Sequence, residues 1–247
     1  VRRPHRKIVC PAGLLHLALP LGLLLLTVVL LIQPATRRTT MFALSENHPV
    51  EWGTFFTLFA AAGVSIVLAW RVRKRCALFV PIFFGLFGVG LFVVAMEEIA
   101  WGQWVFGWDT PESWEAVNAQ GETTLHNLGA LQGHSELFRI AFGVGGLIGV
   151  AAMVWRPLRA IAVPPVLAGW FVVITVHGGL DLLNDFATLH VRFDALVDET
   201  AELNEFFIGL AAMLYVVMAA QRHARWRTAG DEISGRLGRG EVAGRAA

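Results

Sequence analysis

Long apolar runs constrain this chain more than any other feature. A helix needs roughly 20 apolar residues to cross about 30 Å of hydrocarbon. Six segments reach or nearly reach that length: Ile8 to Gln33, Gly53 to Trp70, Ala77 to Met96, Leu137 to Trp155, Ala160 to about Asn184, and Glu205 to Gln221. The sequence therefore predicts an all-α, polytopic membrane protein with six transmembrane helices.

Composition agrees with this interpretation. Hydrophobic residues make up 55% of the 247 residues, charged residues make up 16%, and the mean hydropathy is +0.58. Those values are too apolar for a soluble domain of this size. The first run is longer than the apolar region of a signal peptide, and no small-x-small cleavage pattern follows Gln33. We therefore expect a retained helix, kinked by Pro11 and Pro20.

The positions of Lys and Arg predict the orientation, because positively charged loops stay in the cytoplasm. With the N-terminus inside, the inner segments hold 16 of the 20 Lys and Arg residues. We expect a protein of the bacterial cytoplasmic (inner) membrane with both termini in the cytoplasm. Residues 1–221 would form the transmembrane domain, and residues 222–247 a basic, disordered cytoplasmic tail.

Carboxylates show the opposite distribution. Of the 19 Asp and Glu residues, only Asp231, Glu232 and Glu241 fall inside in this topology. The chain has no phosphate-binding glycine loop, nucleophile elbow or zinc-binding His-Glu-x-x-His motif. Nucleic acid is not an expected partner, and the polar chemistry is predicted to lie on the extracytoplasmic side.

The third apolar run ends in two adjacent carboxylates, Glu97 and Glu98. Carboxylates at such a position cost a few kcal/mol each if they stay in hydrocarbon, so they must reach water, a partner or a cation. Farther on, Asp109 or Thr110 can cap a short helix that Pro111 begins. We expect an extracytoplasmic, amphipathic interfacial helix between helices 3 and 4.

Potential metal ligands recur at helical spacing in the later outer segments. Glu122 and His126 are four residues apart and share a face if this part is helical. His177 and Asp181 repeat that spacing in the fifth run, and Glu202 precedes the sixth. Four regions of the chain are thus expected to deliver His or carboxylate groups to one membrane leaflet.

The stretch from Glu97 to Asn127 resembles a family of uncharacterised multi-pass bacterial membrane proteins. Its motif is Glu-Glu-Ile-Ser-Trp-Gly-Gln, followed by Asn-x-Gln-x-Glu-x-x-Leu-His-Asn. Here Ala100 replaces the serine, and Trp104 stands where that family has arginine. The resemblance covers about 30 residues. It implies that they belong to one site, and it implies no activity.

Imidazole and carboxylate are ligands of zinc, iron and manganese, and helix bundles build such sites from inward-facing residues. The sequence predicts a divalent transition metal held by Glu122, His126, His177 and Asp181. Glu97, Glu98 and Glu202 are the candidate catalytic carboxylates, with a general base acting on metal-bound water. The predicted function is a metal-dependent hydrolase or transferase, with a membrane lipid as substrate.

Simpler interpretations remain open. His177 and Asp181 can be a hydrogen-bonded pair that ties helices together, and Glu199, Glu202 and Glu205 can be N-terminal acids that complement a helix dipole. A proton- or cation-coupled transporter or channel would also use ionisable groups inside a membrane. The third alternative is a non-catalytic subunit or assembly factor, with a homo-oligomer or a membrane complex as its partner.

Overall fold

The computed structural model describes residues 11–115, 124, 135–187 and 190–245. Every regular element in those ranges is helical. Five helical segments of the described chain are long and apolar enough to cross a membrane: Pro49–Val72, Phe79–Glu98, Ser135–Val154, Pro165–Asn184 and Ala201–Trp226. The structure therefore confirms a multi-pass, all-α membrane protein.

The first predicted span is helix α1 (Pro11–Ile32), which contains Pro20. Its described apolar part, His16–Ile32, is shorter than the five spans. Helix α2 (Pro34–Leu44) follows. Gln33 has extended backbone, which ends α1, and the proline at the first helical position begins α2. Helix α2 was not predicted from the sequence.

Helices α3 (Pro49–Val72) and α4 (Phe79–Glu98) form a hairpin. They pack closely because Gly88 leaves room for Ile66 and Ser65, so a Cβ there would lie 2.8 Å from Ile66 Cγ1. The Ser65 hydroxyl donates to the Phe84 carbonyl at 2.7 Å, which satisfies a buried polar group between the two helices.

Helices α7 (Ser135–Ala151) and α8 (Ala168–Phe186) form a second hairpin. Three short 3₁₀ turns connect them: η3 (Ala152–Val154), η4 (Arg156–Ala160) and η5 (Pro165–Leu167). The sequence predicted the fifth span to begin near Ala160, but Pro164 has extended backbone and the span begins at Pro165. A residue before proline is disfavoured in the helical region, which explains the later start.

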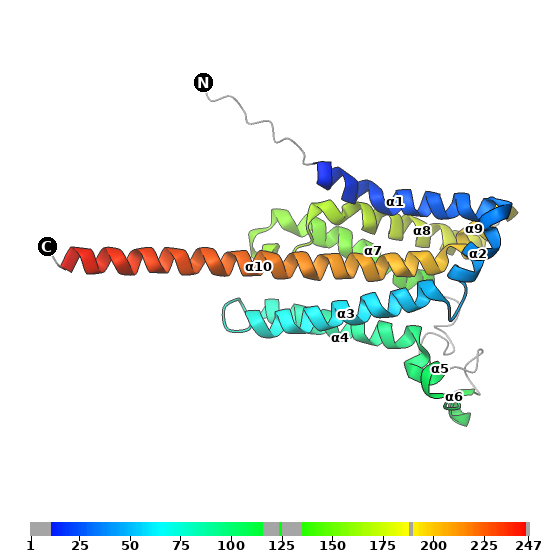
Figure 1. Ribbon diagram of the computed structural model, residues 1–247, viewed down its shortest axis with the longest axis horizontal. Helices are drawn as coiled ribbons and strands as arrows, with labels where there is room; N and C mark the ends of the chain where they lie inside the picture. Colours follow the sequence, from blue (N-terminus) through cyan, green and yellow to red (C-terminus); the bar gives the residue numbers. More distant parts are fainter. Residues whose placement is uncertain (1–10, 116–123, 125–134, 188–189, 246–247) are drawn as a thin grey trace, which may run out of the picture.

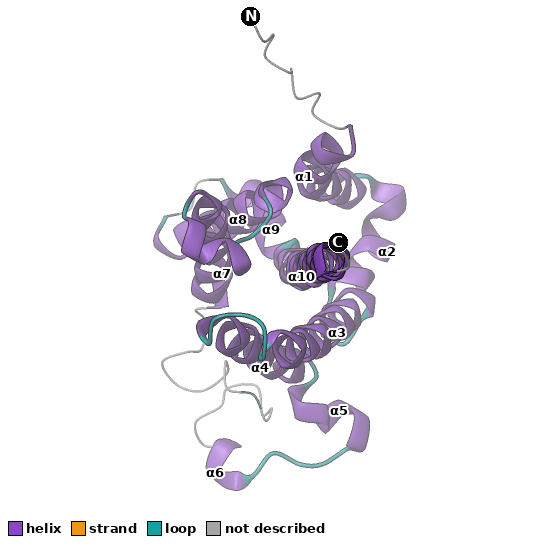
Figure 2. Ribbon diagram, turned by 90° about the vertical axis from the view of Figure 1, so that its left-hand side faces the viewer, coloured by secondary structure: helices purple, strands orange, loops and turns teal. Residues whose placement is uncertain are grey.

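Helix α9 (Val191–Glu199) precedes α10 (Ala201–Arg245). In the end-on view α10 lies inside a ring formed by α1, α8, α7, α4 and α3 (Figure 2). The sequence analysis ended this helix at Gln221, whereas α10 is helical through Arg245. Arg222 donates to the Ala160 and Ala162 carbonyls at 2.9 Å, so this charged residue has protein partners and the helix continues past it.

The outer surface of the bundle is apolar. Side chains that would meet lipid are exposed on α1, α3, α4, α7 and α8, among them Leu25, Val29, Phe56, Phe59, Leu86, Ile148 and Val176. A contiguous apolar surface of this kind marks a membrane or protein contact.

The two ends of the bundle differ. The start of α1 and the end of α10 lie at one end, together with the loop between α3 and α4 (Figure 1). That end carries Arg71 to Arg75 and Arg222, and we call it the basic end. The opposite end, which we call the acidic end, carries the first residues of α3 and α10 and the last of α4 and α8. Two one-turn helices, α5 (Gln103–Phe106) and α6 (Glu112–Glu115), extend from it (Figure 1).

Candidate functional site at the acidic end

A buried arginine connects three helices at the acidic end. Arg139 of α7 is 4% exposed and forms an ion pair with Asp181 of α8. A second guanidinium nitrogen lies 3.6 Å from Glu205 Oε1 of α10, and Arg139 also donates to Ser135 Oγ at 3.3 Å. A buried charge needs such partners, because an isolated one is strongly unfavourable in a low-dielectric environment. Arg139 therefore fixes the relative positions of α7, α8 and α10.

His177 lies one turn from Asp181 on α8 but has a different partner. It is 4% exposed, and its Nε2 lies 2.9 Å from the hydroxyl of Thr200, between α9 and α10. That hydroxyl has one proton, which it donates to the Leu196 carbonyl at 2.8 Å. The His177 Nε2–H is therefore the donor to Thr200. In a neutral ring the lone pair is then on Nδ1, which is buried and makes no hydrogen bond to the described residues.

Carboxylates from three helices surround Glu98, the last residue of α4. The groups that act on it electrostatically are Glu205, Glu202, Glu51 and Glu97. We call these five residues the carboxylate cluster. All five side chains are partly buried. Like charges in a partly buried cluster repel one another, so ionising all five carboxylates together is unfavourable.

The turn after Glu98 has unusual backbone geometry. Ala100, Trp101 and Gly102 have φ values of 45°, 56° and 88°, all in the left-handed region. Non-glycine residues rarely adopt this region, and strained backbone of this kind often occurs at functional sites. The turn brings the Trp101 indole back over α4, where Nε1 donates to Glu97 Oε1 at 2.5 Å. The strained turn thus orients one carboxylate of the cluster.

The residues after this turn bond to one another. Gln103 Nε2 donates to the Thr110 hydroxyl at 3.0 Å, and Thr110 is buried. A single helical turn, α6, follows Pro111, and the interfacial helix stays a prediction. The Glu-Glu-Ile-Ala-Trp-Gly-Gln motif is therefore the end of a span, a left-handed turn and the start of the segment that leaves the bundle.

The predicted metal ligands are described only in part. Glu122 and His126 lie outside the described residues. His177 and Asp181 are both at the acidic end, but one bonds to Thr200 and the other to Arg139. Among the described residues, no group of three or more His, Cys, Asp or Glu side chains is placed to hold a metal ion.

The predicted catalytic residues Glu97, Glu98 and Glu202 lie together in the carboxylate cluster. Glu199, in contrast, is the last residue of α9, and its Oε1 lies 2.6 Å from Arg37 of α2. The sequence analysis grouped Glu199 with Glu202 and Glu205. The break at Thr200 separates them and directs Glu199 to a different neighbour.

Comparisons with protein-family models, with curated proteins and with solved structures find no match to this chain. The interpretation of the acidic end therefore depends on its geometry.

Three residues of the site were missing from the predictions. Arg139 had a detectable signal, because a lone arginine two residues into an apolar run must have a partner. Glu51 had a weak one, as an acid two residues before the predicted span from Gly53, and the structure places it in the first turn of α3. Nothing in the sequence marked Thr200, whose role depends on the junction between α9 and α10.

Buried apolar residues lie near mid-depth on α3, α4, α8 and α10, as Ala62, Leu91, Ile174, Ala211 and Ala212 show. The polar groups of the acidic end are therefore separated from those of the basic end by a packed apolar layer.

Proposed function

We propose that this chain is a six-span protein of the bacterial cytoplasmic membrane, with both termini in the cytoplasm and the acidic end outside. Two observations support the orientation: most Lys and Arg residues belong to one end, and the start of α1 and the end of α10 lie there (Figure 1). Helix α1 supports the sixth span, because its 22 residues correspond to about 33 Å of helix. In this proposal α5 and α6 lie at the outer interface.

We further propose that the acidic end is the active site of a hydrolase or transferase that acts on a membrane lipid. The observation that carries this proposal is a cluster of carboxylates from α3, α4 and α10, which Arg139 links to Asp181 of α8 through Glu205, at one side of a packed apolar layer. A one-sided site in contact with the membrane surface suits a substrate that enters from the outer leaflet.

Each residue has a role in this proposal. Glu98 and Glu202 are the proton donor and acceptor, because crowded carboxylates readily keep one proton among them. Trp101 positions Glu97 through its indole N–H. Arg139 positions Asp181 and Glu205. The His177 Nδ1 lone pair is a base or a metal ligand, oriented by the bond from Nε2 to Thr200.

A divalent transition metal remains part of the proposal, as zinc, iron or manganese. His177 would supply one ligand through Nδ1, and Asp181 would have to ligate while it keeps its ion pair with Arg139. Glu122 and His126, which lie outside the described residues, would be the other two. A metal at this position would supply a Lewis acid for an ester, amide or phosphate.

A proton- or cation-coupled transporter is the second candidate. The four carboxylates around Glu98 favour it, since ionisable groups within a membrane mark proton and cation paths. The apolar layer at mid-depth favours the enzyme, because a transporter requires a route to the other side.

A subunit that packs against other proteins has less support. Several of the small residues that would mediate such packing already pack against another helix of the same chain. A Cβ at Gly143 would overlap Thr175, and one at Gly146 would overlap the Phe171 ring. Gly85, Gly90 and Gly145 face open space and remain available to a partner or a second copy of the chain.

The proposed activity can be tested with full-length protein in vesicles of phosphatidylethanolamine and phosphatidylglycerol, with lipid products identified by mass spectrometry. We expect Glu98→Gln and Glu202→Gln to lower turnover at least about 100-fold, the usual loss for a general acid or base. Glu112→Gln, an exposed carboxylate on α6, is the matched control and should turn over like wild type.

Metal content and proton flux are measured on the same preparations. A near-stoichiometric metal that is lost in His177→Gln would establish the metal version. Proton uptake by vesicles that contain a pH-sensitive dye, without lipid turnover, would replace the enzyme by the transporter. Lipid turnover that is equal in wild type and both glutamine variants would contradict the assigned roles.

A further inference from the structure

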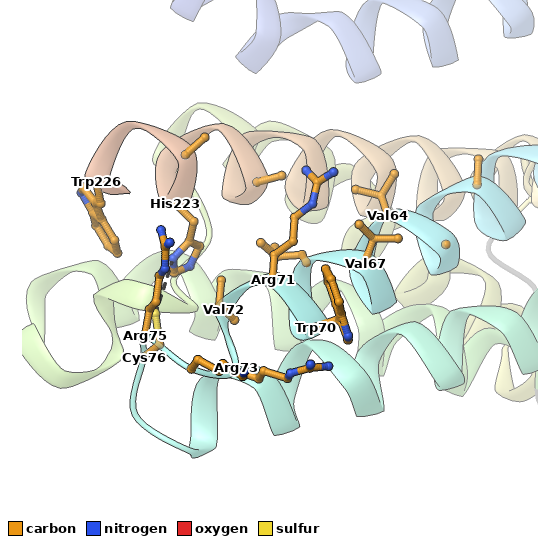
Figure 3. Close-up of a pocket in the computed structure, with 16 residues that line it drawn as sticks. Val64, Val67, Trp70, Arg71, Val72, Arg73, Arg75, Cys76, His223 and Trp226 are labelled. Carbon is orange, nitrogen blue, oxygen red and sulfur yellow. Dashed lines mark hydrogen bonds between the residues drawn. The ribbon is translucent and has the colours of Figure 1, made fainter. Parts of the chain in front are cut away.

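A groove at the basic end lies between α3 and α10, on the opposite side of the apolar layer from the carboxylate cluster. Its volume is about 1430 Å³. It is lined along its length by small and aliphatic side chains, including Gly63, Val64 and Val67 of α3. Figure 3 shows this wall, with the cationic side chains gathered at its outer end. The groove is therefore apolar along the span and charged where the span leaves the membrane.

Four cationic side chains surround the mouth: Arg71, Arg73, Lys74 and Arg75. All four are exposed, and none forms an ion pair with a described residue. No Asp or Glu lines the groove. Arg71 extends from α3 toward α10, and Arg75 lies beside His223 (Figure 3). The mouth thus presents uncompensated positive charge to whatever occupies the groove.

Two tryptophans mark the depth of the mouth. Trp70 and Trp226 both line it, and the Arg73 guanidinium lies 4.7 Å from the Trp70 ring centroid. Tryptophan is enriched at the level of lipid headgroups. The two spans also end here, at Val72 and Trp226. The charged mouth is therefore at the height where the membrane carries phosphate.

The length of the apolar wall matches one leaflet. It extends along α3 from Ala60 to the mouth at Trp70, which corresponds to about 15 Å of helix. Half of a typical hydrocarbon core is about 15 Å. A molecule with an acyl chain and an anionic head at opposite ends would satisfy both parts of the groove.

We propose that this groove binds an anionic phospholipid from the adjoining leaflet, with an acyl chain along Gly63, Val64 and Val67 and the phosphate at Arg71 and Arg75. Basic pockets between helices on the cytoplasmic side commonly hold such headgroups. The occupant is a bound lipid, not a substrate, because the groove lies beyond the apolar layer from the proposed active site. The inference does not depend on the activity proposed above.

The test is a lipid titration of full-length protein in detergent, followed by native mass spectrometry. The probes are phosphatidylglycerol, phosphatidylcholine with the same acyl chains, and glycerol 3-phosphate as a headgroup without chains. We expect phosphatidylglycerol to bind preferentially. The double variant Arg71→Gln/Arg75→Gln should bind it roughly 25-fold more weakly, at about fivefold for each charge.

Two further variants separate charge from shape. Arg38→Gln/Arg192→Gln removes two exposed cations at the acidic end and should bind phosphatidylglycerol like wild type. Gly63→Leu fills the groove where a Cβ meets nothing within 4 Å, so it should fold and should lose affinity although every charge remains.

Three outcomes would overturn the proposal. They are equal binding of phosphatidylglycerol and phosphatidylcholine, unchanged binding in Arg71→Gln/Arg75→Gln, and competition by glycerol 3-phosphate at the same concentration as the lipid. The last would show a phosphate site that makes no use of the apolar wall. Lipid turnover is measured in Arg71→Gln/Arg75→Gln as well. Because this variant changes only the basic end, a loss of phosphatidylglycerol binding with unchanged turnover would separate the lipid site from the activity proposed for the acidic end.

Discussion

Arg139 of α7 and Asp181 of α8 form an ion pair within the acidic end, where only 5% of the arginine side chain and 16% of the aspartate side chain are exposed. Removing one partner of a buried pair leaves an uncompensated charge. We expect Asp181→Asn to lower the free energy of unfolding by about 3 kcal/mol, measured by denaturant titration in bicelles.

The ion pair between Arg37 and Glu199 is the matched control. Its arginine is 50% exposed, so solvent screens the interaction. Glu199→Gln should cost no more than about 1 kcal/mol. If the two substitutions had equal effects, the Arg139–Asp181 pair would not be the main link between α7 and α8 at this end.

The left-handed turn after α4 is the basis of a second prediction. Gly102 has a φ of 88°, and a Cβ there would lie 3.0 Å from the Phe106 ring. We expect Gly102→Ala to lower stability by about 1 kcal/mol or more, because the substitution is strained at that φ. Gly145→Ala is the control, because Gly145 is helical and faces open space. It should be neutral or stabilising by up to about 1 kcal/mol.

The spans that the sequence predicted are those that a continuous apolar run defines by itself, without reference to neighbouring helices. The runs from Gly53, Ala77 and Leu137 correspond to α3, α4 and α7 with boundaries shifted by a few residues. Hydrocarbon thickness alone sets these lengths, so no knowledge of neighbours was needed. The last helix was predicted too short because Arg222 resembles the end of a span until its carbonyl partners are known.

The site was predictable in its location and only partly in its contacts. Glu97 and Glu98 were visible as carboxylates at the end of an apolar run, which has a physical cost that must be offset. The partners of His177 and Asp181 were not visible, because equal spacing along α8 does not specify which neighbouring helix each side chain meets. Arg139 and Thr200 supply those partners from residues distant in sequence.

His177 provides a prediction that needs no activity assay. Because the Thr200 hydroxyl proton is donated to Leu196, the neutral ring must carry its proton on Nε2. Nitrogen-15 NMR of histidine-labelled protein in lipid should show the Nε2–H tautomer for this residue, assigned by its loss in His177→Gln. Thr200→Val removes the acceptor and should shift the Nε2 resonance. A dominant Nδ1–H tautomer in wild type would contradict the hydrogen-bond assignment.

Cys76, in the loop between α3 and α4, has a predictable reactivity. Its sulfur lies 3.9 Å from His223 Nδ1, and burial raises the pKa of the thiol above its ordinary value. The thiolate is the form that reacts with maleimide, so a raised pKa keeps Cys76 protonated, and slow to react, to a higher pH. In a Cys10→Ser background, the midpoint of the alkylation rate against pH should lie above that of a cysteine peptide, about 8.5.

The same protein unfolded in detergent and urea should return to the peptide value, because the burial is lost. A midpoint at or below that of the peptide in folded protein would show that the loop is open and that the thiol is not packed against α10.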